Sequence, residues 1–327
     1  MIRTLPATLA LLLAASLACA APPKRPASHQ FGVIGNSFAS NGGEQRLKQG
    51  LSRLSDPDLE FVVVSGIKNA KENCSDELYL ERRDLLELAE RPLVVVPAAG
   101  DWSACRNSAG RPAGTERLTR LRELLYPEPS TLGVHKLALT RLSASAQFRS
   151  YAEYSQWVVG KVLYATLNLP ADNNRYLAEA GRNSEFEDRQ VANRFWLHRL
   201  FAQAKRMKLD AIVLFSEGDM KAQPEESGLR ALLTRSAKED GYAAARKQLL
   251  AQAANYEGKV LLVDSAPLAK DSEPAIVWRD KLGHLSVGAH ALSVKVTPGA
   301  PSMFALKLAD TGHRPAAAKA ASAKDAR

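Results

Sequence analysis

Short apolar runs that alternate with longer helix-forming stretches limit most strongly how this chain can fold. The runs lie at residues 31–36 (FGVIGN), 60–65 (EFVVVS), 92–97 (PLVVVP), 160–170, 210–219 and 258–264. Short runs rich in β-branched and aromatic residues, bounded by turn-forming residues, are typical of strands. Because these runs are apolar almost without interruption, we expect both faces of each strand to be buried.

The stretches between these strands carry helix signals. Helices are predicted at residues 43–54, 75–90, 115–127, 186–208, 225–236 and 240–256. In the second of these, Ser75 is suited to the N-cap position and leucines recur on one face. Strands that alternate with helices predict an α/β protein whose sheets are covered by helices.

The chain ends in two further strand candidates, residues 290–296 (HALSVKV) and 302–308 (SMFALKL). The short link TPGAP between them favours antiparallel pairing at a sheet edge. No repeat and no long linker interrupts the pattern, so residues 31–308 are expected to form one domain.

The N-terminus has the layout of a secretory signal. Residues 1–20 combine Arg3, an apolar core and the small residues around Cys19, with cleavage expected after Ala20. A lipoprotein would carry its lipid on Cys19, but residues 16–18 fit that pattern poorly. Residues 21–30 are predicted to be a disordered leader, and residues 309–327 a disordered tail rich in Ala and Lys. We therefore expect a periplasmic or secreted protein.

Composition limits the classes of partner. The formal net charge is +9, but the tail contributes part of it and the rest is spread along helices. Nucleic-acid binding would need a clustered basic face with aromatic residues or a known motif, and the sequence has neither. No run after the signal approaches the roughly 18 apolar residues of a membrane span, so an integral membrane protein is not expected. The classes of partner that the sequence leaves open are an unknown protein and a small anionic ligand.

Two cysteines, Cys74 and Cys105, remain after removal of the signal. An even pair in an exported chain predicts a disulfide. A metal site at either cysteine is the weaker alternative, because no histidine or second cysteine lies near at ligand spacing.

Several motifs together resemble a known family. FGVIGNSF, FVVVSGIK, VVVPAAGDWSAC, VLYATLNLPADNN, RQVANRFWL and KVLLVDSAPL follow one another over about residues 31–270. In order and spacing they resemble a bacterial branch of the calcineurin-like metallophosphoesterases. The resemblance implies a four-layer α/β/β/α sandwich and a site in which two metal ions bind a phosphoester and an attacking hydroxide.

A two-metal site needs several carboxylate or imidazole ligands, because two nearby dications otherwise repel each other. The family supplies them from loops at strand ends. Here its first Gly-Asp motif falls on Gly35 and Asn36, so the carboxylate has become an amide. The second falls near Gly66, which has no side-chain ligand. The Gly-Asp-Asn motif falls on residues 98–100, ending at Gly100.

The family's histidine positions are also changed. The middle one falls on Ser216 or Glu217, and the closing motif falls on residues 264–268, DSAPL. Losses at several separate loops indicate an abandoned metal site. We therefore predict no bound metal and no catalytic residue, with a vestigial cleft listed in chain order as Asn36, Gly66, Gly100, Asp101, Asn168, Glu217 and Asp264.

Three of these residues leave alternatives open. Asp101 could supply a carboxylate or cap the following turn, and Asn168 could bond to its own turn. Asp264 could contact a ligand or pair with a Lys or Arg. His284 and His290 are the closest histidine pair, but the sequence shows no partner carboxylate for them.

The sequence therefore favours a catalytically inactive binding or scaffold module. The alternative is a metal-dependent phosphoester hydrolase in which Asp101, Glu217 and Asp264 replace the lost ligands and hold a divalent ion such as Mn, Fe or Zn.

Overall fold

The structure is a computed structural model that describes residues 28–178, 183–223 and 240–308. The predicted signal, the disordered tail, the helix predicted at residues 225–236 and most of the leader lie outside these residues. The last residues of the predicted leader do not: His29 and Gln30 belong to the first strand. His29 is buried there, and its Nε2 lies 2.6 Å from the hydroxyl oxygen of Tyr164.

Two sheets make up the centre of the protein. The first has the order β12-β11-β1-β2-β3 and the second the order β4-β5-β6-β7-β8-β10-β9. The strands of the first are β1 (His29–Ile34), β2 (Leu59–Ser65), β3 (Leu93–Val96), β11 (Ala291–Val296) and β12 (Phe304–Leu308). Those of the second are β4 (Thr140–Arg141), β5 (Ser155–Val159), β6 (Val162–Thr166), β7 (Ala211–Phe215), β8 (Lys259–Asp264), β9 (Val277–Arg279) and β10 (Leu282–Ser286).

Parallel pairing dominates the middle of both sheets. β1, β2 and β3 are parallel, as are β6, β7, β8 and β10. The predicted C-terminal pair is present, with β12 antiparallel to β11 at one edge. The run at 160–170 is not one long strand, because β5 turns at Gly160 and Lys161 into antiparallel β6.

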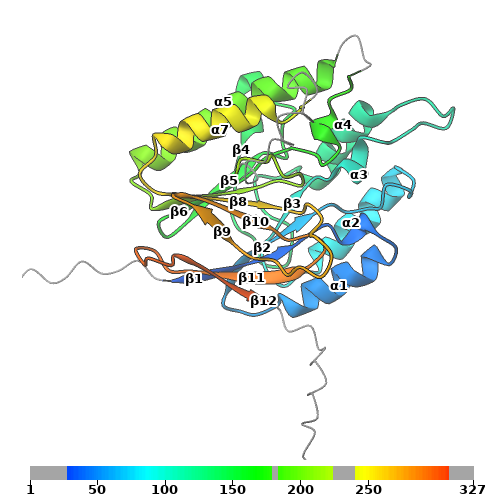
Figure 1. The fold of residues 1–327 in the computed structure, drawn as a ribbon. Coiled ribbons are helices and arrows are strands. Elements are labelled where there is room, and N and C mark those ends of the chain that lie inside the picture. The colour runs from blue at the N-terminus through cyan, green and yellow to red at the C-terminus, as the bar shows by residue number, and fades with distance from the viewer. Residues whose placement is uncertain (1–27, 179–182, 224–239, 309–327) are drawn as a thin grey trace, which may run out of the picture.

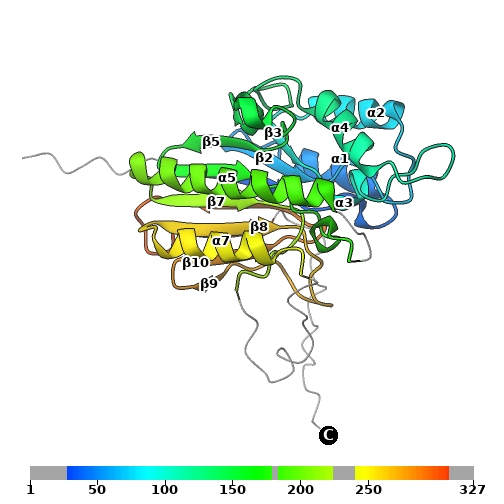
Figure 2. The ribbon, with the colours of Figure 1, turned by 90° about the horizontal axis from the view of Figure 1, so that it is seen from above.

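Helices cover the outer face of each sheet (Figures 1 and 2). α1 (Gly43–Arg53), α2 (Asp76–Glu87) and α4 (Gly114–Leu125) lie on the first sheet, whereas α5 (Ser184–Arg206) and α7 (Ala243–Ala254) lie on the second. α3 (Ala99–Trp102) is a single turn after β3. Ser75 caps α2 as expected, because its hydroxyl accepts a bond from the backbone N–H of Leu78.

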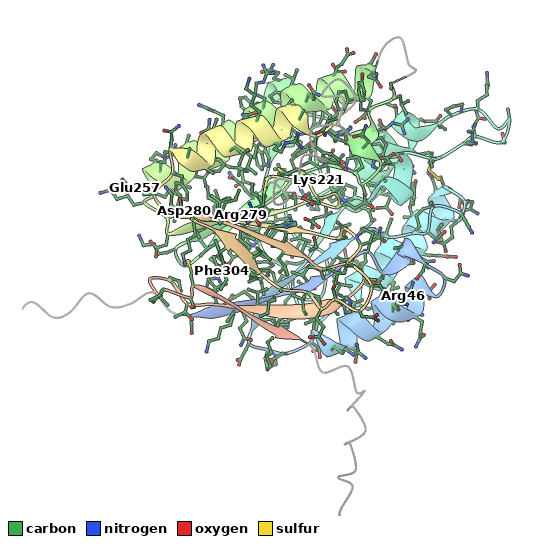
Figure 3. The ribbon with its side chains drawn as sticks, viewed as in Figure 1. Arg46, Lys221, Glu257, Arg279, Asp280 and Phe304 are labelled. Atoms are coloured by element: carbon green, nitrogen blue, oxygen red, sulfur yellow. A yellow bond between two sulfur atoms is a disulfide. The ribbon has the colours of Figure 1, made fainter. Side chains whose placement is uncertain are left out.

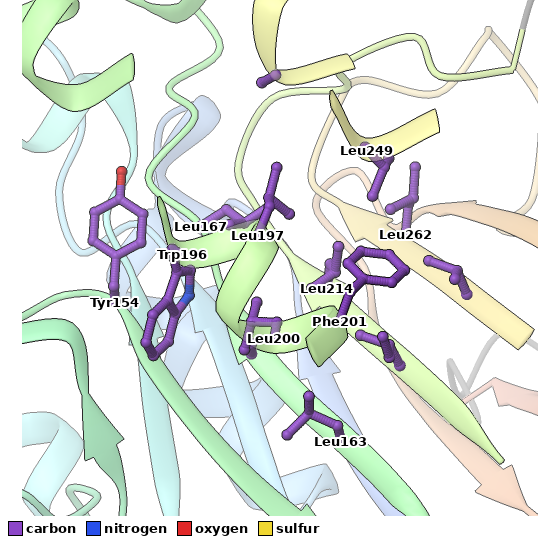
Figure 4. Close-up of a cluster of buried hydrophobic side chains, with 14 of the residues drawn as sticks. Tyr154, Leu163, Leu167, Trp196, Leu197, Leu200, Phe201, Leu214, Leu249 and Leu262 are labelled. Carbon is purple, nitrogen blue, oxygen red and sulfur yellow. The ribbon is translucent and has the colours of Figure 1, made fainter. Parts of the chain in front are cut away.

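Three apolar clusters fix the order of the layers. Phe31 and Phe61 of the first sheet pack against Trp157, Tyr164 and Phe215 of the second, so the two sheets meet face to face. A second cluster joins α5 and α7 to the outer face of the second sheet (Figure 4). A third joins α1, α2 and α4 to the first sheet. The predicted four-layer α/β/β/α sandwich is confirmed.

Among the described residues, no helix is long and apolar enough to span a bilayer.

Candidate functional site

The loops at the carboxyl ends of the parallel strands form the candidate site. In open α/β sheets, ligands bind beyond this edge. The residues aligned with the family's metal ligands follow β1, β2, β3, β7 and β8, so each sheet contributes loops. The structure shows which of these loops meet.

The carboxyl group of Glu217 is bonded to three loops, which follow β1, β3 and β6. Its Oε1 accepts a bond from Asn36 Nδ2 at 3.2 Å, after β1. Its Oε2 accepts bonds from the backbone N–H of Ala99 at 2.5 Å, after β3, and of Ala171 at 2.8 Å, beyond β6. Glu217 is 4% exposed. It therefore links loops of the two sheets.

Burial makes this group a weak acid. Loss of hydration raises the pKa of Glu217 to about 8, against the opposing effect of the two backbone N–H bonds, and the charges of Asp101 and Asp172 raise it further. At neutral pH the carboxyl group is therefore mostly protonated. A metal ion binding to this carboxyl group would therefore have to displace its proton.

Asn36 is bonded to Glu217 and lies close to Gly66. The Oδ1 of Asn36 accepts a bond from the backbone N–H of Phe38 at 3.1 Å, so both ends of its amide are engaged. Gly66 has a φ of 72°, and a Cβ there would lie 2.9 Å from the Cβ of Ala98 and 3.2 Å from Asn36 Oδ1. A ligand side chain at position 66 has no room without movement of these neighbours.

Asp101 is fully buried and holds the loops after β2 and β3 together. Its Oδ1 accepts bonds from the backbone N–H groups of Ile67 (2.9 Å) and Lys68 (3.1 Å), and its Oδ2 from that of Ala98 (2.8 Å). Lys68 Nζ donates to the carbonyl of Gly100 at 2.7 Å. Burial raises the pKa of Asp101 to about 6, although these N–H bonds lower it. The geometry favours the capping role for Asp101.

Asn168 belongs to a different cluster. Its Nδ2 donates to Glu153 Oε1 at 2.9 Å, and Glu153 also forms an ion pair with Arg122. The side chain of Glu153 is inaccessible to solvent, so its charge requires this pairing. The structure therefore does not bring Asn168 to Glu217. Sequence reasoning missed Glu153, because nothing local marks it as buried.

The sequence predicted that Asp264 faces the cleft, but its side chain points away from the space between the sheets. Along β8, Val260 and Leu262 point to the helix-covered outer face, and the alternation of strand residues puts Asp264 on that same face. Glu217, two residues beyond inward-facing Phe215, points between the sheets. The two carboxyl groups lie on opposite faces of the second sheet.

The partner of Asp264 is a histidine rather than a Lys or Arg. His284 Nε2 lies 2.6 Å from Asp264 Oδ2 and 3.6 Å from Asp219 Oδ1. Burial lowers the pKa of His284, but the bond to Asp264 and the charges of Asp264 and Asp219 outweigh it, so the pKa is raised. Sequence reasoning missed the carboxylates beside this histidine. Their separation along the chain hid them, and only the pairing of β8 with β10 joins them.

The residues around Glu217 do not have the ligand set of a two-metal site. The carboxyl group of Glu217 has N–H donors on both oxygens, and the loop after β1 offers the amide of Asn36 in place of a carboxylate. Within the described residues, one His/Asp/Glu group has ligand geometry, and it consists of Asp219, Asp264 and His284. The replacement set Asp101, Glu217 and Asp264 is thus not brought together.

The disulfide between Cys74 and Cys105 is present, with the two Cα atoms 5.9 Å apart. It connects the segment before α2 to the segment after α3. Both segments follow strands of the first sheet, so the disulfide fastens the outer part of the loop layer that Asp101 holds from within (Figure 3).

Comparison with known proteins leaves the family open. No family model matches the chain. No curated protein matches it either. Among solved structures, a phosphatase from Mycoplasma pneumoniae matches with a TM-score of 0.40 and 10% identity, over 83% of this chain and 89% of that chain. A similarity this low says nothing about chemistry, which must be judged from the residues of the site.

Proposed function

We propose that the protein is an exported, metallophosphoesterase-like binding or scaffold module that does not hydrolyse phosphoesters. The observation that carries this proposal is the position of Glu217. Its carboxyl group fills the space between the loops after β1, β3 and β6 and is bonded to all three. To coordinate two catalytic cations, this carboxyl group would have to give up its bonds to three N–H donors.

The remaining polar groups of the cleft support the same proposal. The oxygens of Asp101 are bonded to backbone N–H groups, and the amide of Asn36 is bonded at both ends. These bonds stabilise the loops and occupy oxygens that could otherwise bind a metal ion or activate a water molecule. A protein or a small anionic ligand is the partner that fits a module of this kind, and the periplasm or the secreted fraction is its proposed location.

The test is an assay of the purified full chain with aryl phosphate mono- and diesters in the presence of Mn²⁺, Fe²⁺ or Zn²⁺. We expect no metal-dependent turnover above that of a Glu217→Gln variant. Turnover that needs metal and disappears in Glu217→Gln would instead support the hydrolase alternative. Mass spectrometry of the exported protein tests the location, because cleavage after Ala20 leaves a chain that begins at Ala21.

A further inference from the structure

Three side chains with metal-binding atoms meet on the outer face of the second sheet. Asp219 follows β7, Asp264 ends β8 and His284 lies in β10. Each offers one ligand atom, and these atoms all lie within 4.8 Å of one another. The group is on the opposite face of the second sheet from Glu217, so it is separate from the loop contacts that Glu217 makes.

Strand pairing brings two of the three together. β8 and β10 are parallel, and Asp264 is paired with Ser286. Because strand residues two apart share a face, His284 projects from β10 on the same side as Ser286. The register therefore places the imidazole beside the carboxylate of Asp264.

The loop after β7 adds Asp219. Met220 and Ala222, on either side of Lys221, are buried in the cluster beneath α5 and α7. Gln223 Nε2 donates to the carbonyls of Val277 (3.0 Å) and Leu282 (2.8 Å). These contacts hold the loop against β9 and β10. Lys221, which belongs to this loop, is labelled in Figure 3.

Hydrogen bonds orient both carboxylates. Asp264 Oδ1 accepts bonds from the backbone N–H of Ala266 and the hydroxyl of Ser286, each at 2.9 Å, which turns Oδ2 toward His284. Asp219 Oδ1 accepts a bond from the backbone N–H of Lys221 at 2.6 Å. Outer bonds of this kind hold the ligands of protein metal sites in position.

The charge of the group also favours a cation. The side chain of Asp264 is 3% exposed, and buried carboxylates are normally paired with a cation or bound to metal. Among the described residues, neither Asp219 nor Asp264 forms an ion pair with a Lys or Arg; both pair with His284 alone. Two carboxylates thus face one imidazole with no permanently charged side chain beside them.

We propose that Asp219, Asp264 and His284 bind one divalent transition-metal ion, with Zn²⁺ as the best match. One imidazole nitrogen and two carboxylate oxygens form a common zinc ligand set, and three protein ligands leave a fourth position for water. The imidazole favours Zn²⁺ over Mg²⁺ or Ca²⁺, which prefer oxygen ligands alone. Asp219 and His284 are 25% and 21% exposed, so an ion can enter from solvent. Bound there, it would fasten the loop after β7 to β8 and β10.

Calorimetric titration of the untagged full chain with Zn²⁺ tests the site. We expect one ion per chain and an affinity that falls at least about 10-fold in His284→Gln and in Asp219→Asn. His290→Gln is the matched control, because His290 is exposed and is outside the group. It should bind as the wild type does. Mg²⁺ should bind more weakly than Zn²⁺ to the wild type and to His290→Gln.

Thermal unfolding supplies a second readout that also checks folding. Zn²⁺ should raise the unfolding midpoint of the wild type and of His290→Gln, but not that of His284→Gln, since a ligand stabilises only the state that binds it. The proposal is overturned if the wild type binds no Zn²⁺, or if His284→Gln, folded without metal, binds it as tightly as the wild type. Neither outcome depends on turnover, so this site and the proposed function can fail separately.

Discussion

The raised pKa of Glu217 should make the stability of the protein depend on pH. The substitution Glu217→Gln should remove this dependence. The pKa of this carboxyl group is about 8 in the folded chain, against an ordinary value of 4.5. Between these values the folded state keeps a proton that the unfolded chain has released. Stability is therefore lost as the pH rises from about 4.5 to about 8, the direction required for an acid whose pKa is raised by folding.

The size of the effect follows from the same two values. Between pH 6 and pH 8 the unfolded chain is ionised at this position and the folded chain is losing its proton. Linkage gives a loss of about 2 kcal/mol in the free energy of unfolding over that interval. Glu217→Gln keeps a neutral group of the same shape and cannot ionise, so this loss should be absent from the variant.

Urea unfolding of the two proteins at pH 6, 7 and 8 measures the difference. Other groups, including Asp101 and His284, titrate in both proteins, so the difference between the two profiles isolates Glu217. Glu257→Gln is the control, because Glu257 is exposed at the far end of the second sheet from Lys221 (Figure 3), and it should keep the wild-type profile. Parallel profiles for wild type and Glu217→Gln would refute the assignment of a raised pKa to Glu217.

Three further predictions concern stability and can be checked by urea unfolding. Replacing Cys74 and Cys105 by Ala should cost roughly 3–4 kcal/mol, because the disulfide closes a loop between positions separated by 31 residues, and an unchanged midpoint would contradict this. Gly66→Ala should cost more than Gly110→Ala, by at least about 1 kcal/mol, because both glycines have a positive φ but a Cβ meets close neighbours only at Gly66; equal losses would show that the crowding is relieved. Trp196→Ala should cost about 3–5 kcal/mol, since this indole is fully buried between α5 and the second sheet, and a loss below about 1 kcal/mol would contradict that packing.

The layers of the fold could be predicted from the sequence because each depends on a local pattern. Residues 61–64 and 93–96 are apolar without interruption, and a strand in a sandwich of four layers has both faces buried. The sequence predicted that β1 begins at residue 31, whereas it begins at His29. His29 is polar, and only its contact with Tyr164 of the other sheet shows that it is buried.

The candidate site could be predicted only in part. The amide at Asn36 and the missing side chain at Gly66 are visible in the sequence, and the structure bonds Asn36 to Glu217 and places it close to Gly66. That the carboxyl group of Glu217 fills the gap could not be predicted, because its bonds to Ala99 and Ala171 join loops more than 45 residues away along the chain.

The error at Asp264 has a related cause. Alternation along β8 puts its side chain on the face opposite to Leu261 and Val263, but the sequence does not say which face lies between the sheets. The sequence also could not predict that two carboxylates lie near His284. A parallel strand pair and the return of the loop after β7 are needed to bring Asp219 and Asp264 to it.

The central claim is that the cleft between the two sheets, at Glu217, cannot hold a pair of catalytic cations. The most direct measurement is an anomalous diffraction map from a crystal soaked in Mn²⁺ and phosphate. The account predicts no metal peak among Asn36, Gly66, Ala99 and Glu217, with the carboxyl group of Glu217 still bonded to the loops around it. Two peaks about 3.5–4 Å apart in that cleft, with phosphate bridging them, would contradict it.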